Sequence, residues 1–133
     1  YAGSPVGCAA ALAVLDVIDE ENLVERSAAI GARVKERLLD LQKKHLDVIG
    51  DIRADRGAMI AIELVKNGDA EQPDPDLTKA LVGKACENGL ILLSCGVNGN
   101  VIRLLPALTI PDEILDEGMA ILEKSLASLL QAA

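Results

Sequence analysis

Aromatic side chains are almost absent from this sequence, which has one Tyr and neither Phe nor Trp. The net charge is −8, and an acidic chain without rings to stack on bases is unsuited to binding nucleic acid. No apolar run reaches the roughly 20 residues that cross a membrane, and no signal-peptide pattern opens the chain. These absences exclude nucleic-acid and membrane-spanning classes, and we expect a cytoplasmic protein.

Histidine and cysteine are also scarce. His45 is the only histidine, and Cys8, Cys86 and Cys95 form no C-x-x-C pair. An odd number of unpaired cysteines is typical of reduced thiols, and a zinc site or a Ser-His catalytic pair lacks its ligands. Cys95 has no cation or histidine near it in sequence to favour a thiolate, so we expect it to line a pocket or the core rather than act as a nucleophile.

What the chain has in abundance is aliphatic side chains, since half of its 133 residues are apolar. That length suits a single domain with an aliphatic core. Apolar periodicity predicts an α+β fold, in which a small antiparallel-type sheet of about three strands is backed by helices. The predicted helices are 5–18, 23–45, 77–88 and 111–133, and the predicted strands are 58–65, 90–93 and 101–105.

Local signals set the boundaries of these elements. Asn22 and Glu25 resemble a capping box at the start of the second helix, and Gly89 is placed as the C-terminal cap of the third. A turn is predicted through Gly50 and Asp51, and a surface loop over residues 66–76.

The first predicted helix is unusual because residues 6–18 are apolar nearly all round. A helix on the surface of a small domain normally shows a polar stripe. We therefore expect this helix to be buried on most sides, against a partner that the chain itself does not supply. The chain begins at Tyr1 with a structured segment, so we expect it to be a piece of something longer.

Arg103 is the main candidate for a binding residue. It lies in residues 89–106, where two apolar runs flank a loop rich in Gly and Asn. A guanidinium among apolar residues is costly unless an anion pairs with it. That anion is either a substrate carboxylate, which Arg can bind through two parallel hydrogen bonds, or a core acid such as Glu63 in a structural ion pair. The neighbouring loop favours the substrate, since loops at strand ends often carry binding sites.

Two weaker candidates remain. The helix start at residues 1–5 presents free backbone N–H groups that suit a phosphate. Arg53 and Arg56 are interpreted as a charged turn that leads into a strand.

Several motifs resemble class III pyridoxal-phosphate aminotransferases. YAGSP at 1–5, followed by a Cys/Ala-rich helix, resembles the family's T-Y-A-G-N-P segment, and GAMIAIEL at 57–64 resembles its strand of the same letters. GLILLSCG at 89–96 and NVIR at 100–103 look most like the 4-aminobutyrate (GABA) aminotransferase branch. The resemblance implies a single C-terminal small domain, residues 1–133, of a fold-type-I enzyme, with residues 1–21 as a helix that leads out of a missing large domain.

The resemblance also implies where the chemistry resides. Arg103 matches the family arginine that grips the carboxylate of 2-oxoglutarate, glutamate or GABA. The Schiff-base lysine and the acid that pairs with the pyridine nitrogen belong to the large domain, so no catalytic or cofactor-binding residue and no metal site is expected here. The phosphate-contacting threonine would precede Tyr1 and reach a neighbouring subunit's cofactor, which implies a homodimer or higher oligomer. KSLA at 124–127 resembles the segment around the Schiff-base lysine, but it lacks the following Gly-Gly and is interpreted as a coincidence.

The reaction implied is transfer of the amino group of GABA to 2-oxoglutarate, giving succinate semialdehyde and glutamate, with pyridoxal 5′-phosphate (PLP) as cofactor. The isolated chain would be inactive and hold no cofactor. One alternative is an ornithine or acetylornithine aminotransferase, because residues 104–106 resemble those branches about as well. Another is a non-catalytic module that binds a carboxylate. One departure stands out: IRADRG at 52–57 is one residue longer than the family's V-R-G-x-G.

Overall fold

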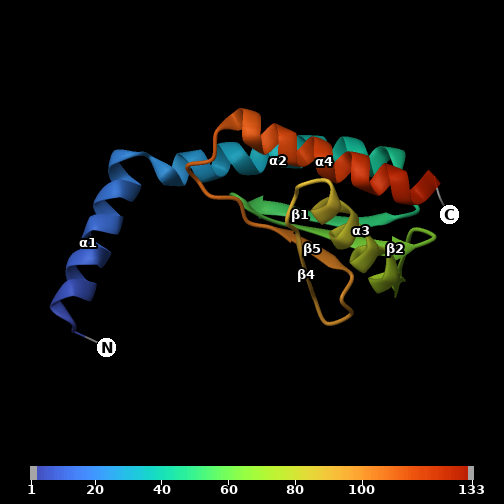
Figure 1. Ribbon diagram of the computed structural model, residues 1–133, viewed down its shortest axis with the longest axis horizontal. Coiled ribbons are helices and arrows are strands. Elements are labelled where there is room, and N and C mark those ends of the chain that lie inside the picture. The colour runs from blue at the N-terminus through green and yellow to red at the C-terminus, as the bar shows by residue number, and fades with distance from the viewer. Residues whose placement is uncertain (1–2, 132–133) are drawn as a thin grey trace.

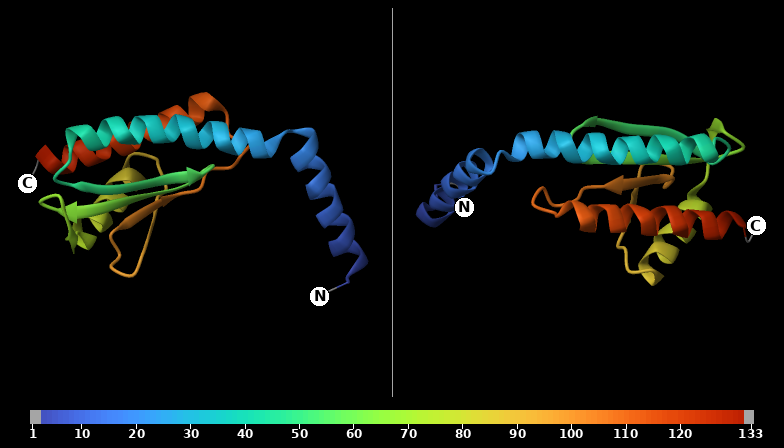
Figure 2. Two further views of the ribbon diagram at one scale, coloured as in Figure 1. Left: turned by 180° about the vertical axis from the view of Figure 1, so that it is seen from behind. Right: turned by 90° about the horizontal axis from the view of Figure 1, so that it is seen from above.

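The computed structural model describes residues 3–131, which form an antiparallel sheet with three helices packed on one face and a further helix that projects away from it (Figures 1 and 2). In chain order the elements are α1 (Pro5–Glu20), α2 (Leu23–Lys44), β1 (Ile49–Arg56), β2 (Met59–Lys66), β3 (Asp69–Pro73), α3 (Pro75–Glu87), β4 (Leu93–Cys95), β5 (Val101–Leu104) and α4 (Asp112–Gln131).

The sheet confirms the predicted α+β class but is larger than predicted. Its strands lie in the order β1-β2-β5-β4, and all pairs are antiparallel. β3 pairs with the C-terminal end of β2, at Val65 and Lys66. Five strands are therefore present where about three were expected. The predicted turn through Gly50 and Asp51 lies inside β1, and the predicted loop contains β3. Both strands lie at the margin of the sheet, and half of β1 and most of β3 is polar, so neither shows the run of apolar residues that predicts a strand.

The extra residue in the segment 52–57 is contained within β1. Arg53 pairs with Ala61 and Arg56 pairs with Met59, so β1 takes three residue steps where β2 takes two. This is a β-bulge, in which one strand accommodates an additional residue while the pairing resumes on either side. Ala54, inside the bulge, is buried.

The core fills the space between the sheet and the helices. Ile62 of β2 and Ile102 of β5 face each other across the strand pair and are at most 2% exposed. Leu38 of α2, Leu81 of α3 and Leu122 of α4 close over them and are equally buried. An aliphatic core of this kind agrees with the near absence of aromatic residues.

The link between α1 and α2 differs from the expected capping box. Asn22 has a left-handed backbone (φ 50°), and its side chain makes no capping hydrogen bond. The capping-box prediction is wrong because a side-chain cap requires an extended residue, whereas Asn22 forms the bend between the two helices. Its carbonyl accepts a hydrogen bond from the Arg26 backbone N–H (3.0 Å).

The other predicted boundaries are confirmed in part. Gly89 follows α3 with φ +93°, as expected of a glycine that ends a helix. Of the strand predicted at 90–93, only Leu93 lies in β4, because the chain around the buried Leu92 is not paired. The predicted end of α4 at Ala133 lies outside the described residues.

Helix α1 forms over the apolar run where a helix is predicted, but it is not buried. None of its residues is buried, and it stands away from the sheet (Figure 2). The expected cover is therefore not provided by residues 3–131. Tyr1 and Ala2, which belong to the predicted phosphate-binding helix start, lie outside the described residues.

Candidate functional site

Arg103 lies at the centre of the uncovered face of the sheet. Successive side chains of a strand point to opposite faces, so the buried Ile102 directs Arg103 away from the helices. Arg103 is directly opposite Ala61 of β2 on one side and Leu93 of β4 on the other. Strand pairing on both sides fixes the position of its backbone.

The guanidinium of Arg103 has no partner within residues 3–131. The side chain is exposed, and it makes no ion pair or side-chain hydrogen bond with any of these residues. The apolar neighbours in sequence suggested burial, but strand alternation places the cation in solvent. The free-energy cost of burying a charge therefore does not arise, and the guanidinium can bind an anion from outside the described residues.

The alternative of an ion pair between Arg103 and Glu63 is wrong. Glu63 Oε2 instead accepts a hydrogen bond from Arg53 Nη1 (2.7 Å), and the same Nη1 donates to Asp51 Oδ2 (2.6 Å). The hydrogen bond to Glu63 and the one to Asp51 raise the pKa of Arg53 further above its usual range. Arg53, first interpreted as part of a charged turn, is the centre of a three-residue ion-pair cluster on β1 and β2.

The loop between β4 and β5 is tied to the sheet by Asn100. This residue is 3% exposed, and its Nδ2 donates to the Leu64 carbonyl (2.9 Å). The Leu64 N–H in turn donates to the Asn100 carbonyl (2.8 Å). Gly96 and Gly99 both have positive φ, which lets the chain reverse before β5. These contacts fix the register in which β5 begins. They thereby fix the position of Arg103 along the strand.

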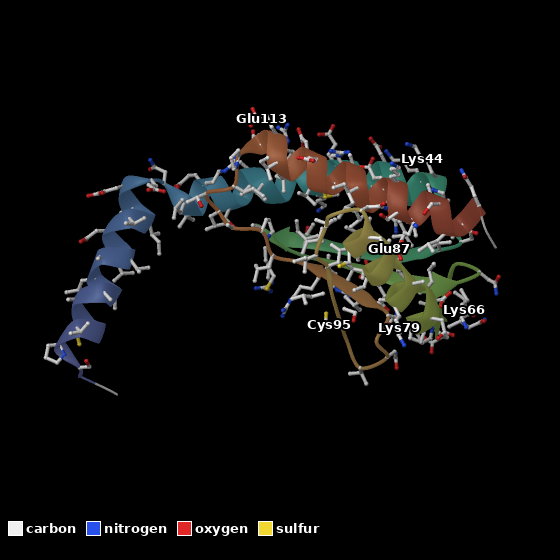
Figure 3. All side chains as sticks on the ribbon, in the orientation of Figure 1. Lys44, Lys66, Lys79, Glu87, Cys95 and Glu113 are labelled. Atoms are coloured by element: carbon white, nitrogen blue, oxygen red, sulfur yellow. The ribbon has the colours of Figure 1, made fainter. Side chains whose placement is uncertain are left out.

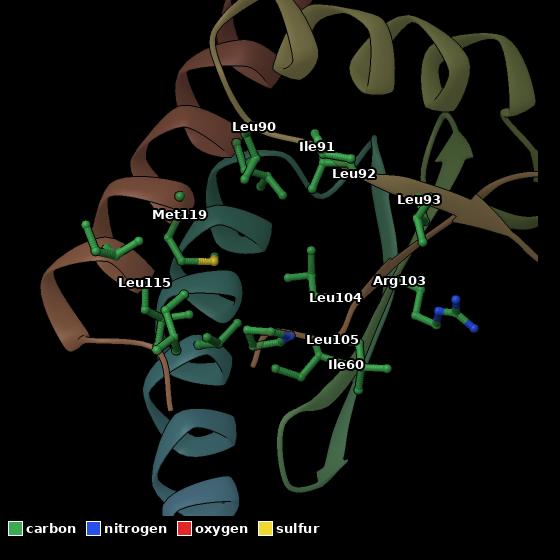
Figure 4. A pocket seen from close by; sticks show the side chains of 16 residues that line it. Ile60, Leu90, Ile91, Leu92, Leu93, Arg103, Leu104, Leu105, Leu115 and Met119 are labelled. Carbon is green, nitrogen blue, oxygen red and sulfur yellow. The ribbon is translucent and has the colours of Figure 1, made fainter. Parts of the chain in front are cut away.

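A cavity of about 460 Å³ lies beside Arg103, between α4 and the strands β4 and β5 (Figure 4). Its walls are aliphatic, and Arg103 is the only charged residue that lines it within the described part of the chain. The guanidinium lies at its edge and points away from Leu104 (Figure 4). The remaining lining comes mainly from Ile60, Leu90, Leu92, Leu115 and Met119.

Among residues 3–131, neither Cys95 nor His45 lines the cavity beside Arg103. Cys95 is half-buried on β4, and His45 ends α2. Within residues 3–131 no group of three His, Cys, Asp or Glu side chains is placed to hold a metal ion. None of the helices described is long and apolar enough to cross a bilayer. Among the described residues, the site therefore presents one exposed cation, Arg103, beside an aliphatic cavity.

Comparison with known proteins identifies the family. Residues 1–126 match the family described as aminotransferase class-III. The chain belongs to this family. It is 54% identical over 129 residues to the 5-aminovalerate aminotransferase DavT of Pseudomonas aeruginosa, covering 97% of the chain and 30% of that protein. It is 52% identical over 126 residues to a probable 4-aminobutyrate aminotransferase of Bacillus subtilis, covering 95% of the chain and 28% of that protein.

Solved structures agree with this class III assignment. A Bacillus anthracis aminotransferase superposes with a TM-score of 0.85 at 33% identity, covering 95% of the chain and 29% of that structure. A phospholyase from Arthrobacter, in complex with phosphoethanolamine, superposes with a TM-score of 0.84 at 33% identity, covering 93% of the chain and 29% of that structure. The chain thus spans less than a third of the relatives it matches, and its likeness extends to an enzyme with a different reaction.

Class III aminotransferases are PLP-dependent, but the described residues do not by themselves fit that cofactor. PLP needs a lysine for its aldehyde, and no lysine lines the apolar cavity. Lys44, Lys66 and Lys79 lie on the outside of the molecule (Figure 3). Lys124, in the segment that resembles the Schiff-base motif, is exposed on α4. The cofactor would have to be held by residues other than these.

Proposed function

We propose that this chain is the C-terminal small domain, residues 1–133, of a PLP-dependent aminotransferase that transfers the amino group of 4-aminobutyrate to 2-oxoglutarate, giving succinate semialdehyde and glutamate. Residues 1–21 lead into it from a large domain, which supplies the Schiff-base lysine. The proposal is supported by relatives at about half identity, of which the chain spans only 28–30%. The complete enzyme would be a cytoplasmic homodimer or higher oligomer.

The observation that carries this proposal is Arg103, which is exposed on the open sheet face and has no ion-pair partner among residues 3–131. An arginine presents a planar pair of donors that binds a carboxylate in one orientation. Arg103 would hold the remote carboxylate of 4-aminobutyrate in one half-reaction and the α-carboxylate of glutamate in the other. PLP, when bound, supplies the electron sink. Arg103 would hold the carboxylate so that the amino group of the substrate approaches PLP in one orientation.

The choice of donor rests on the relatives. 4-Aminobutyrate and 5-aminovalerate are both unbranched, with an amine at one end and a carboxylate at the other, and they differ by one methylene. 5-Aminovalerate is the second candidate, because the Pseudomonas relative at 54% identity bears that name. The relatives favour both donors over ornithine and acetylornithine, and favour an enzyme over a non-catalytic module.

The test of the proposal is a donor comparison with the full-length protein that carries this chain, loaded with PLP. We expect glutamate to form from 2-oxoglutarate with 4-aminobutyrate or 5-aminovalerate, and at least tenfold less kcat/KM with ornithine and acetylornithine. Glutamate formation from none of the four donors contradicts the proposal. Release of phosphate from phosphoethanolamine without amino transfer would instead assign the protein to the lyase chemistry of its Arthrobacter relative.

A substitution at Arg103 tests the site itself. Arg103→Ala should raise KM for the donor about 10- to 100-fold and lower kcat, because hydrogen bonds to charged groups contribute about 1.5–3 kcal/mol. The absorbance of bound PLP should persist. Arg103→Lys should also perform poorly, since it loses the planar fork. Arg56→Ala is the matched control, because it removes an equal charge at the exposed end of β1. Unchanged kinetics in Arg103→Ala removes this residue from the site.

A further inference from the structure

The residue directly opposite Arg103 on β2 is Ala61, and Ala61 is also directly opposite Arg53 on β1. Arg53, Ala61 and Arg103 therefore form one row across three strands, with their side chains on the uncovered face of the sheet. Directly opposite residues have Cβ atoms about 4.5–5.5 Å apart. Because the side chain of Ala61 ends at Cβ, its position is a notch in the row, with an arginine on each side.

The other neighbours of Arg103 around its position in the strand are branched aliphatic residues. Leu93 is directly opposite Arg103 on β4 and is 56% exposed. Val101 lies two residues before Arg103, and Leu105, two residues after it, is 64% exposed. A carboxylate that accepts two parallel hydrogen bonds must lie at the edge of the guanidinium and in its plane. Branched side chains obstruct that approach from β4 and along β5, whereas on the side of β2 the guanidinium is flanked only by a methyl group.

The carboxylate nearest the notch is already paired. Glu63 follows Ala61 by two residues on β2, and its Oε2 accepts a hydrogen bond from Arg53 Nη1 at 2.7 Å. The same Nη1 donates to Asp51 Oδ2 at 2.6 Å. The charge of Arg53 is thus shared by two acids, and Arg103 is the cation beside the notch that has no ion-pair partner in the described part of the chain.

We propose that Ala61 is a specificity-determining residue, because its small size leaves room over β2 for the α-carboxylate of glutamate to bind Arg103. This inference rests on the proposed function and deepens it, since it states on which side of the guanidinium the substrate lies. Ala61 would touch the substrate through its methyl group and would offer it no polar contact. The size of residue 61, rather than its polarity, would decide whether the carboxylate fits.

Substitutions of graded size at residue 61 test this inference in the PLP-loaded full-length enzyme. The rate at which PLP absorbance is lost in a single turnover with glutamate gives the half-saturating glutamate concentration. That concentration should rise about tenfold in Ala61→Val and further in Ala61→Leu, because the larger side chain displaces a hydrogen bond between the carboxylate and the guanidinium. Ala61→Ser adds a single heavy atom and should have a smaller effect than Ala61→Val. Val favours strands more than Ala does, so weaker strand formation does not account for the loss.

A double-mutant cycle with Arg103→Ala separates exclusion of the carboxylate from damage to the sheet. If Ala61→Val acts only by keeping the carboxylate away from Arg103, it should change the half-saturating concentration less than about twofold once Arg103 is absent. Damage to the sheet would instead raise that concentration by the same factor in both backgrounds. Ala70→Val is the matched control, because it makes the same substitution at an exposed position on β3 and should leave glutamate binding unchanged.

Three results overturn the inference: an unchanged half-saturating concentration in Ala61→Val, equal effects of Ala61→Val with and without Arg103, or an equal effect of Ala70→Val. Failure of the proposed function gives a different result. If Arg103→Ala weakens glutamate binding while Ala61→Val does not, Arg103 remains the carboxylate site and the carboxylate approaches it from another side. If Arg103→Ala leaves glutamate binding unchanged, the proposed site itself is wrong.

Discussion

The close approach of Gly31 to the β1–β2 hairpin is a tight backbone constraint at the scale of single residues. A Cβ atom added to Gly31 in α2 would lie 2.3 Å from the Gly57 carbonyl oxygen. Gly57 has φ +60°, and one residue later the Ala58 N–H donates to Ser27 Oγ (3.0 Å). The helix and the hairpin are therefore in backbone contact, and only glycine fits between them.

Gly31→Ala should lower the free energy of unfolding by about 1–3 kcal/mol, because the added methyl forces helix and hairpin apart. Urea denaturation measures this change. Gly83→Ala is the matched control: Gly83 is also in a helix, α3, but a Cβ there meets nothing within 4 Å. That control should be stabilising by about 0.4–1 kcal/mol. Equal effects of the two substitutions contradict the packing argument.

The sequence alone singles out Arg103 as a candidate binding residue, although the structure corrects the reason for choosing it. Its apolar neighbours suggested a buried cation, whereas strand alternation makes it an exposed one beside the buried Ile102. The contact between Arg53 and Glu63 was not accessible in the same way. It depends on the register of two strands, one of which contains a bulge, and residue spacing along a single chain does not specify that register.

At the scale of elements, α2 and α4 are joined by a ladder of ion pairs. Arg33 Nε donates to Asp116 Oδ1 (2.9 Å), and Arg37 Nε donates to Glu123 Oε1 (2.9 Å). Arg26 adds a third pair, with Asp112 at 2.7 Å. Helical spacing predicts that the charged residues of α2 form a solvated face. Three of these residues instead form ion pairs with α4. Their partners lie about 80 residues later in the chain, so only the folded structure shows them.

Asp116→Asn should flatten the pH dependence of stability. The hydrogen bond from Arg33 holds the pKa of the Asp116 carboxyl below its usual range. A carboxyl with a lower pKa in the folded state stabilises the fold fully above its unfolded pKa of about 3.9, and that stabilisation is lost as pH falls through the folded pKa. The wild type should thus lose Tm more steeply between about pH 5 and pH 3 than the variant does.

Thermal unfolding across that pH range measures the difference, and salt provides a second check. Because the pair is exposed, the advantage of the wild type at neutral pH should shrink in about 1 M NaCl. Glu117→Gln is the control, since Glu117 is exposed on α4 and forms no ion pair with any residue from 3 to 131. A Tm profile of Asp116→Asn that parallels the wild type rules out a contribution from the ladder.

Apolar periodicity does not predict β1 and β3, and the reason is the same for both strands. β3 reads Asp-Ala-Glu-Gln-Pro, and in β1 charged residues take up half of the eight positions, with only Ile49 and Ala54 buried. Both pair with β2, and β3 buries no residue, whereas β1 adds only a few apolar side chains to the core. Elements that bury a clear apolar stripe, such as α2, were placed to within about two residues of their ends, which is as close as such boundaries are defined.

At the scale of the whole molecule, α1 leaves a large apolar surface without cover. Its residues are apolar nearly all round, and none of them is buried by the described chain. Contiguous apolar surface of this kind marks an interaction site. The most exposed of its larger side chains are Val6, Leu12, Val14 and Leu15.

The 133-residue chain on its own should therefore self-associate through α1, and Leu12→Glu with Leu15→Glu should reduce this association. Both leucines are about 60% exposed, and placing two carboxylates on one helix would oppose its packing against a second copy. Sedimentation velocity over a hundredfold range of concentration measures the shift from oligomer to monomer. Val97→Glu is the control, since Val97 is also exposed and apolar but lies in the β4–β5 loop, remote from α1 (Figure 1). An equal loss of association in Val97→Glu would place the contact on the sheet instead, and a monomeric wild type would show that exposure of α1 alone does not drive association.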